Sequence, residues 1–427
     1  MVAILLICIA IFLLIGMPIA FSMGMGAMLA LLWDGKLPLV LIPQKMFLGL
    51  DSWLLLAIPL FMLAGELMNS GGISKRLITF SSELFGFVRG SLGMITVAAS
   101  MIFAAITGSS VACTAAVGSI MLPIMEEKGY NMRFATALQA AAGAIGPIIP
   151  PSLMMVLIGY LTHTSTVELF IGGVVPGIMI GIGLMVVMYL HAVKGGDAYL
   201  PANAAFSPKR VFMTGIKALP GLGLPIIIIF GILGGIFTVT EAAVVGVAYG
   251  FIVGMFVYRE LKLKDIPNML FRSAELATII LFIVSATSLF GWLITVNQVP
   301  ETLAKIMLAK VTSLYGFYVL YIILLIIVGM FMESFSASIV IIPLVFPLAR
   351  SFGMDPVHFG VVTTVAWAIG YITPPFGVTL FVSCSLTGKS IREVTPYIFP
   401  IAASMLIVLL IITFFPQTFL WLAKSLK

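Results

Sequence analysis

The chain has 427 residues, of which 61% are hydrophobic and 9% are charged, and its formal net charge is +6. With a mean hydropathy of +1.22, this composition excludes a soluble globular protein and indicates a polytopic membrane protein in a lipid bilayer. The Lys and Arg residues gather in short loops between apolar segments, where they orient a membrane protein. No basic stripe with interleaved aromatic residues is present in the sequence, so nucleic acid is not an expected partner.

The first half of the chain predicts helices of two kinds, unbroken ones and interrupted ones. In order, the expected elements are helices at 2–16, 20–33 and 53–69, an amphipathic arm at 73–88, a hairpin at 91–127, a broken helix at 132–160 and a helix at 170–190. The first apolar stretch has no basic n-region and no small-residue cleavage site, which favours a retained helix over a signal peptide. The hairpin is inferred from Thr107-Gly108-Ser109-Ser110, a polar interruption that is tolerated at membrane depth only where protein or a water-filled cavity shields the backbone.

The second half repeats this order after a polar linker. Its expected elements are helices near 220–236, 242–257 and 273–295, an arm at 300–311, a hairpin at 314–350, a broken helix at 357–382 and a helix at 396–415. We therefore divide the chain into a first repeat (1–192), a cytoplasmic linker (193–217) and a second repeat (218–427). Each repeat is predicted to contain scaffold helices, an arm, a re-entrant hairpin and a broken helix.

A recurring motif is the basis for the division into repeats. IGPIIPPS at 145–152 returns as IGYITPPF at 369–376, an offset of 224 residues (369 − 145), and the same offset pairs Ser110 with Ser334. A Gly followed by two adjacent prolines stops an α-helix, because proline lacks the amide donor and clashes with the preceding turn. Two broken helices at corresponding places in two halves are the best sequence indication of a transporter's binding site.

Charge placement predicts that the repeats are inverted. The loops assigned to the cytoplasm by the positive-inside rule carry Lys75, Arg76, Arg89, Lys128, Arg133, Lys194, Lys209, Arg210, Lys217, Arg259, Lys262, Lys264 and Arg272. Counting spans places the base of the second hairpin, with Arg350 and Asp355, on the opposite side, and the N-terminus outside. Four lysines count against this topology because they fall outside: Lys305, Lys310, Lys424 and Lys427.

Each hairpin tip that faces a helix break is expected to form a cation site, because unpaired carbonyls and hydroxyls are the hard oxygen ligands that suit Na⁺. The first cluster comprises Thr107, Ser109 and Ser110 of the tip with Gly146, Ile149 and Pro151 of the break. The second comprises Gly329, Glu333 and Ser334 with Gly370, Thr373 and Phe376. Freed helix ends also offer N–H groups and a positive dipole to an anionic substrate, which we expect in the vicinity of Gly108, Pro147, Pro150, Ser336 and Pro374.

Other roles for these residues stay open. Small residues at the tips can simply permit close helix packing, and Gly-Pro pairs can be structural kinks. Glu333 is either functional, as intramembrane carboxylates usually are, or a cap held by tip N–H groups. The methionines and the three cysteines are interpreted as packing residues.

TGSS at 107–110, IGPIIPPS, ITPPFG at 372–377 and the order of elements resemble the large membrane subunit, DctM or SiaM, of tripartite ATP-independent periplasmic (TRAP) transporters. The resemblance implies Na⁺-coupled uptake of an organic acid across the bacterial inner membrane by an elevator mechanism, in which a transport domain of hairpins and broken helices slides against a scaffold. It also implies two partners, a small four-helix membrane subunit and a periplasmic substrate-binding protein. No fused N-terminal extension is seen, so the small subunit is expected to be a separate chain. Overall similarity favours a sialic acid transporter.

Two other functions were weighed. A self-sufficient Na⁺/dicarboxylate symporter of the same superfamily would need no binding protein, but such relatives carry Ser-Asn-Thr signatures at the tips, unlike TGSS here. An intramembrane enzyme is disfavoured, because the sequence has no Gly-x-Ser-x-Gly elbow with a helical His partner, no paired intramembrane aspartates and no His-Glu-x-x-His motif. The chain is therefore predicted not to be an enzyme.

Overall fold

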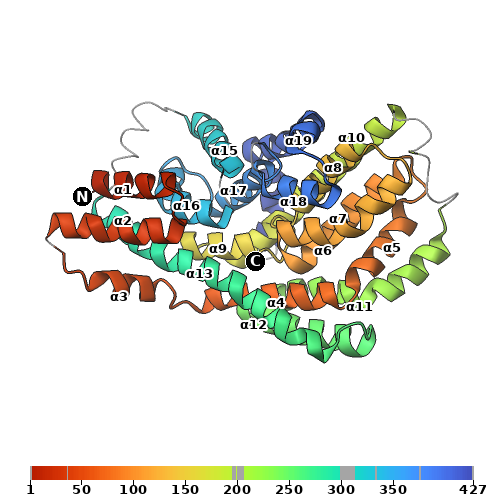
Figure 1. Cartoon of the computed structure of the whole chain (residues 1–427), viewed down its shortest axis with the longest axis horizontal. Helices are drawn as coiled ribbons and strands as arrows, with labels where there is room; N and C mark the ends of the chain where they lie inside the picture. The colour runs from red at the N-terminus through yellow and green to blue at the C-terminus, as the bar shows by residue number, and fades with distance from the viewer. Residues whose placement is uncertain are drawn as a thin grey trace.

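The computed structural model describes residues 2–35, 37–194, 199, 206–298, 313–331, 334–374 and 377–425. Within these ranges the regular structure is entirely helical (Figure 1), and eight helices are long and apolar enough to cross a membrane. The predicted fold class, an all-α polytopic membrane protein built from two inverted repeats with hairpins and broken helices, is confirmed.

The first half contains four α-helices before the arm, then the hairpin, the broken helix and one long helix. Its helices are α1 (Val2–Leu14), α2 (Ile19–Asp34), α3 (Leu41–Leu48), the 3₁₀ turn η1 (Trp53–Leu56), α4 (Ala57–Ser70), α5 (Ile73–Phe85), α6 (Ser91–Thr107), α7 (Ser110–Glu127), α8 (Met132–Ala144), α9 (Leu153–Thr162) and α10 (Thr166–Lys194). The pair α6 and α7 is the first hairpin, and α8 with α9 is the first broken helix.

The second half follows the same order with longer scaffold helices. Its helices are α11 (Pro208–Leu233), α12 (Val239–Ile252), a π-helical turn η3 (Val253–Val257), a 3₁₀ turn η4 (Leu263–Asp265), α13 (Ile266–Val296), α15 (Leu314–Phe331), α16 (Ser334–Ser351), α17 (Pro356–Gly370), α18 (Val378–Thr387), α19 (Ile391–Phe414) and α20 (Gln417–Ser425). The arm expected at 300–311 lies outside the described residues.

The two halves agree in helix boundaries as well as in motifs. The second arm of the first hairpin, α7, begins at Ser110, and the second arm of the second hairpin, α16, begins at Ser334. Both arms are 18 residues long, so the offset of 224 holds at their starts and ends. The broken helices agree in the same way. The side chain of Asn131 caps α8 and that of Asp355 caps α17, each by accepting hydrogen bonds from two backbone amides of the first turn. Equivalent caps fix equivalent starts, because they satisfy amides that the helix itself leaves unpaired.

Three elements differ from the expectation. The helix α11 begins at Pro208, so the last ten residues of the expected linker are helical; Ser207 caps this helix by accepting from the Arg210 amide, and proline is favoured at the first helical position. The short helix α3 and the C-terminal helix α20 were not predicted. With 8 and 9 residues, both are too short for the apolar run of about 20 residues that indicates a membrane span.

The helices pack as two groups that meet along a seam. In one group α4 packs on α12, and α13 packs on α2, α3 and α4; in the other α7 packs on α8, α15 on α17, and α18 on both α7 and α8. Figure 1 shows the first group along the lower left of the view and the hairpins and broken helices above and to the right of it. Contacts of α4 with α6 and of α13 with α16 join the groups, so both hairpins lie against the group formed by α4 and α13.

Candidate functional site

The tip of the first hairpin is a tight reversal built by glycine and serine. The helix α6 ends at Thr107, and Gly108 follows with φ of 59°, a left-handed conformation that glycine adopts without steric cost. Ser109 then starts α7 as its N-cap, with its hydroxyl oxygen accepting from the Ala112 amide at 3.4 Å. Three residues therefore end one membrane helix and start the next.

This tip lies directly against the break of the first broken helix. The helix α8 ends at Ala144 and α9 starts at Leu153. A Cβ added to Gly108 would overlap the carbonyl oxygen of Pro151, and one added to Gly146 would lie 2.6 Å from the carbonyl oxygen of Ser109. The approach is backbone to backbone, which explains why glycine is required at both positions.

The second hairpin also meets the second broken helix backbone to backbone, here between Gly329 in the last turn of α15 and Gly370, the last residue of α17. A Cβ added to Gly370 would lie 2.8 Å from the Cα of Gly329 and 3.2 Å from its carbonyl oxygen. The Thr373 hydroxyl, in the break, donates to the Ile369 carbonyl at 2.6 Å. Two of the predicted ligands of this second cluster, Glu333 and Phe376, lie outside the described residues.

Hydroxyl oxygens at the first tip and at the second break keep lone pairs that can face a cation. The Thr107 hydroxyl donates to the Phe103 carbonyl at 3.3 Å, as the Thr373 hydroxyl does to Ile369, so both oxygens keep their acceptor lone pairs. Thr107 is buried and lies beside Gly65 of α4. Neutral oxygens crowded against glycine backbone are a donor set that fits a small hard cation such as Na⁺.

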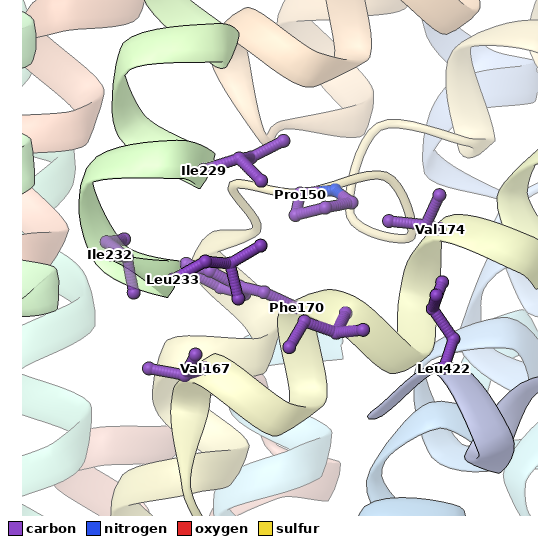
Figure 2. Close-up of a pocket in the computed structure, with 9 residues that line it drawn as sticks. Pro150, Val167, Phe170, Val174, Ile229, Ile232, Leu233 and Leu422 are labelled. Atoms are coloured by element: carbon purple, nitrogen blue, oxygen red, sulfur yellow. The ribbon is translucent and has the colours of Figure 1, made fainter. Parts of the chain in front are cut away.

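Other predicted site residues have different surroundings. The Ile149 side chain packs against Gly177 of α10, and the carbonyl of Pro147 accepts from the Ser152 hydroxyl inside the break. Pro150 lines an apolar cavity with residues of α10, α11 and α20 (Figure 2). In the second repeat Ser334 is buried at the first position of α16, whereas Ser336 and Pro374 are partly exposed.

A cavity with a mixed polar and apolar lining beside the first tip contains residues that the sequence reasoning did not assign to the site. It has a volume of about 80 Å³, and Thr107 and Ser109 line it together with Glu66, Asn69, Arg272 and Ser273 among its polar residues. Glu66 of α4 and Arg272 of α13 form an ion pair at 3.7 Å, and the same two residues line a second, larger depression of about 250 Å³. The sequence signal that could have identified Glu66 is a carboxylate within an otherwise apolar span, since such groups are usually functional.

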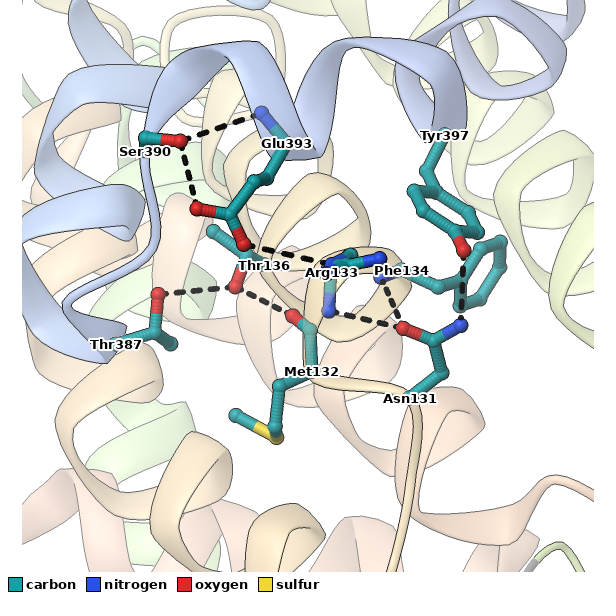
Figure 3. A network of polar contacts seen from close by, with 9 residues as sticks. All are labelled: Asn131, Met132, Arg133, Phe134, Thr136, Thr387, Ser390, Glu393 and Tyr397. Atoms are coloured by element: carbon teal, nitrogen blue, oxygen red, sulfur yellow. Dashed lines mark hydrogen bonds and ion pairs between the residues drawn. The ribbon is translucent and has the colours of Figure 1, made fainter.

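A network of polar contacts joins the two broken helices (Figure 3). The Asn131 side-chain amide donates to the Tyr397 hydroxyl at 3.1 Å, and the Thr136 hydroxyl bonds that of Thr387 at 3.0 Å. Outside the figure, the Ser383 hydroxyl donates to the Thr136 carbonyl at 2.8 Å. The ion pair Arg133–Glu393, at 3.4 Å, lies in the same network.

The backbone amide of Asn131 also donates to the Tyr199 hydroxyl at 3.1 Å. Burial raises the pKa of the Tyr199 phenol, so this residue of the linker acts as a neutral hydrogen-bonding group. The bonds from Asn131, Arg133 and Thr136 to residues of α18 and α19 hold the first broken helix to the second repeat.

Comparison with known proteins identifies the family. The family described as "Tripartite ATP-independent periplasmic transporter, DctM component" matches residues 6–418. The chain is 38% identical to the C4-dicarboxylate TRAP transporter large permease protein DctM of Pseudomonas aeruginosa over 95% of each chain. It is 34% identical to the sialic acid TRAP transporter large permease protein SiaM of Vibrio cholerae, over 94% of this chain and 93% of that one.

A further relative and one solved structure complete the comparison. The chain is 38% identical to the isethionate TRAP transporter permease protein DctMQ of Oleidesulfovibrio alaskensis over 95% of its own length, and it spans 64% of that relative. The YdaH transporter of Alcanivorax borkumensis shares the fold, with a TM-score of 0.56 and 14% identity over 86% of each chain. These relatives are named transporters or transporter permeases, so the expectation that the chain is not an enzyme is confirmed. The chain belongs to the DctM component family of tripartite ATP-independent periplasmic transporters.

Proposed function

We propose that this membrane protein is a large permease subunit that uses Na⁺ to drive uptake of a small organic anion across the bacterial inner membrane, with its N-terminus in the periplasm. The observation that carries the proposal is the backbone-to-backbone meeting of each hairpin with a broken helix, Gly108 of the first tip against Pro151 of the first break and Gly329 of α15 against Gly370 at the end of α17. Helix packing alone would not require the same close approach to recur in both halves of the chain. A duplicated pair of interrupted helices is the arrangement from which transporters build their ion and substrate sites.

The coupling ion follows from the donor set. The tips and breaks supply neutral oxygens such as those of Thr107 and Thr373, which suit a hard cation and do not titrate. Because the site is duplicated, more than one Na⁺ is expected per substrate. Bound Na⁺ also offsets the charge of the anion, whose other partners are the amides at the starts of α7 and α9.

The cargo is proposed as a class. Relatives of comparable identity are named for isethionate, C4-dicarboxylates, sialic acid and 2,3-diketo-L-gulonate, which share a small size and a carboxylate or sulfonate group. Sialic acid, favoured by the overall resemblance, is one candidate within this class. The relatives named for other anions are 32 to 38% identical to the chain, so identity alone gives sialic acid no preference.

The partners are proposed from the tripartite description of the family. A small four-helix membrane subunit would enlarge the fixed group around α4, α12 and α13, and a periplasmic binding protein would deliver the anion to the outer face. The hairpins and broken helices would then move as the transport domain of an elevator.

Reconstitution tests the proposal. The permease, co-expressed with its small subunit, is placed in liposomes, and uptake of labelled succinate, isethionate and sialic acid is followed with and without the purified binding protein. We expect uptake of one class member that needs both the binding protein and an inward Na⁺ gradient. Uptake that persists without Na⁺ when a proton gradient is supplied contradicts the coupling, and uptake that needs Na⁺ but no binding protein favours the self-sufficient symporter.

A further inference from the structure

An apolar cavity of about 170 Å³ lies between the two groups of helices. Its lining comprises Pro150, Val167, Phe170, Ile171, Val174, Ile229, Ile232, Leu233 and Leu422. Figure 2 shows these side chains approaching the same space from four elements: the first break, α10, α11 and the C-terminal helix α20. Every lining residue is aliphatic, aromatic or proline, so the cavity offers no polar side-chain partner.

The cavity lies where the side chains of α10 and α11 leave space between the two helices. The helix α10 packs on α6, α9, α17, α19 and α20, whereas α11 packs on α5, α6 and α12. Protein interiors are normally packed without voids larger than a water molecule. A space of this size is therefore large enough to take an apolar guest.

The surroundings of the cavity indicate a lipid environment. Both α10 and α11 are long and apolar enough to cross a membrane, and large apolar side chains next to the lining residues are exposed: Phe230 is 67% exposed, Trp421 58% and Ile178 45%. These residues would contact acyl chains in a bilayer. The lining residues sit at the end of α11 and the start of α10, at the ends of these helices opposite Lys194, Lys209 and Arg210, which flank the segment that joins the two helices.

We propose that one acyl chain of a bilayer phospholipid, from the leaflet opposite the cytoplasmic linker, inserts between α10 and α11 and fills this cavity beside Pro150. The chemistry selects the occupant. Cavities of about 150 Å³ lined by Leu, Ile and Phe stay dry and bind apolar guests, and an organic anion would lose its hydration here without gaining a hydrogen bond.

The position of the lipid chain gives it a role that is separate from the substrate. Its walls belong to helices on both sides of the seam, with Ile229, Ile232 and Leu233 from α11 facing Phe170 and Val174 from α10. Apolar contact is non-directional, so a hydrocarbon chain keeps the seam filled without fixing α10 to α11.

Photo-crosslinking with a phospholipid tests the proposal directly. The intact protein is placed in nanodiscs of phosphatidylcholine that contains a phosphatidylcholine with a diazirine near the end of one acyl chain, and labelled residues are mapped by mass spectrometry. We expect labelling of Phe170, Val174 and Ile229. Val174→Phe fills the cavity and should lower labelling of Phe170 and Ile229 by about threefold or more, because a core with no spare volume excludes an added guest.

The matched control is Val186→Phe, the same change on the same helix at a residue that is 51% exposed, which should leave labelling of the cavity unchanged. A second variant, Ile229→Ala, enlarges the cavity from the α11 side and should raise labelling of Phe170. This variant tests the proposal independently if Val174→Phe does not fold. Absence of label on all lining residues while Val186 and Phe230 are labelled overturns the proposal. Equal labelling in the wild type and in all three variants overturns it as well.

Discussion

Position 370 has no room for a side chain. A Cβ there would lie 2.8 Å from the Cα and 2.9 Å from the carbonyl carbon of Gly329, both backbone atoms that cannot move alone. We predict that Gly370→Val lowers Na⁺-dependent uptake by about tenfold or more, because overpacking of this kind costs about 1 to 3 kcal/mol and separates the end of α17 from α15. Uptake is measured in membrane vesicles at equal expression.

The control is Gly291→Val on α13, where an added Cβ meets no atom within 4 Å. Both variants place a β-branched residue in a helix, so they share the propensity cost. If uptake falls equally in both, helix propensity explains the effect and the contact between Gly329 and Gly370 does not.

Ser109 combines a structural and a proposed ion-binding role. Its hydroxyl oxygen caps α7 at 3.4 Å from the Ala112 amide, and we predict that Ser109→Ala raises the Na⁺ concentration for half-maximal uptake severalfold. Ser207→Ala removes a cap of the same geometry from α11, also at 3.4 Å. Each loss should cost about 1 kcal/mol of helix stability, so an equal change of Na⁺ dependence in both variants would mean that capping alone matters.

Individual residues differ in how far sequence could assign them. Gly146 and Gly370 were predictable, because a motif repeated at a fixed offset marks positions that both halves need. Glu66 and Arg272 were not assigned to the site, since a single sequence does not tell which faces of two distant helices meet. The Pro150 ring, expected near the substrate, lines the apolar cavity, because the chain turns within the break.

At the scale of elements, hairpins and broken helices were the most predictable part of the fold. Gly and Pro interrupt long apolar runs at 107–110, 145–152 and 371–377, and an interruption of that kind cannot continue a helix. The start of α11 was not predicted, because Pro208 lies in the polar stretch expected to be linker (193–217), although proline also suits a first helical turn.

The packing of elements predicts which pairs move together. Thr136 of α8 and Thr387 of α18 are joined by a hydrogen bond at 3.0 Å, so we predict that a crosslink between cysteines at these positions leaves uptake largely unchanged. A Cβ on Gly65 of α4 would lie 3.6 Å from that of Thr107, close to the separation of about 3.8 Å typical of a disulfide. A Gly65→Cys/Thr107→Cys crosslink should therefore arrest transport.

Both pairs are made in a background without Cys8, Cys113 and Cys384, and uptake is compared before and after reduction. Reduction corrects for the effect of each substitution by itself. Inhibition by the Thr136–Thr387 crosslink, relieved on reduction, would mean that the two broken helices move relative to each other and would contradict a single transport domain.

At the scale of the whole molecule, the two groups of helices indicate where a small membrane subunit would bind. An elevator needs a fixed group that resists sliding, and here α1, α2, α11 and α12 lack polar tips and expose large apolar side chains such as Ile7 at 58%, Trp33 at 77% and Val244 at 51%. A four-helix membrane subunit packed against part of this surface would widen the fixed group without obstructing the hairpins.

We therefore predict where the small subunit docks. Single cysteines are placed at Ile7, Trp33 and Val244 in the cysteine-free background. At least one of them should crosslink reproducibly to the co-expressed small subunit. A cysteine at Ser109 in the first tip should give no crosslink. The physical reason is that a partner bound at the tip would stop the backbone approach of Gly146 to Ser109 and could not remain fixed while that tip moves. Crosslinks from Ser109 with none from the three scaffold positions would mean that the moving and fixed groups have been assigned the wrong way round.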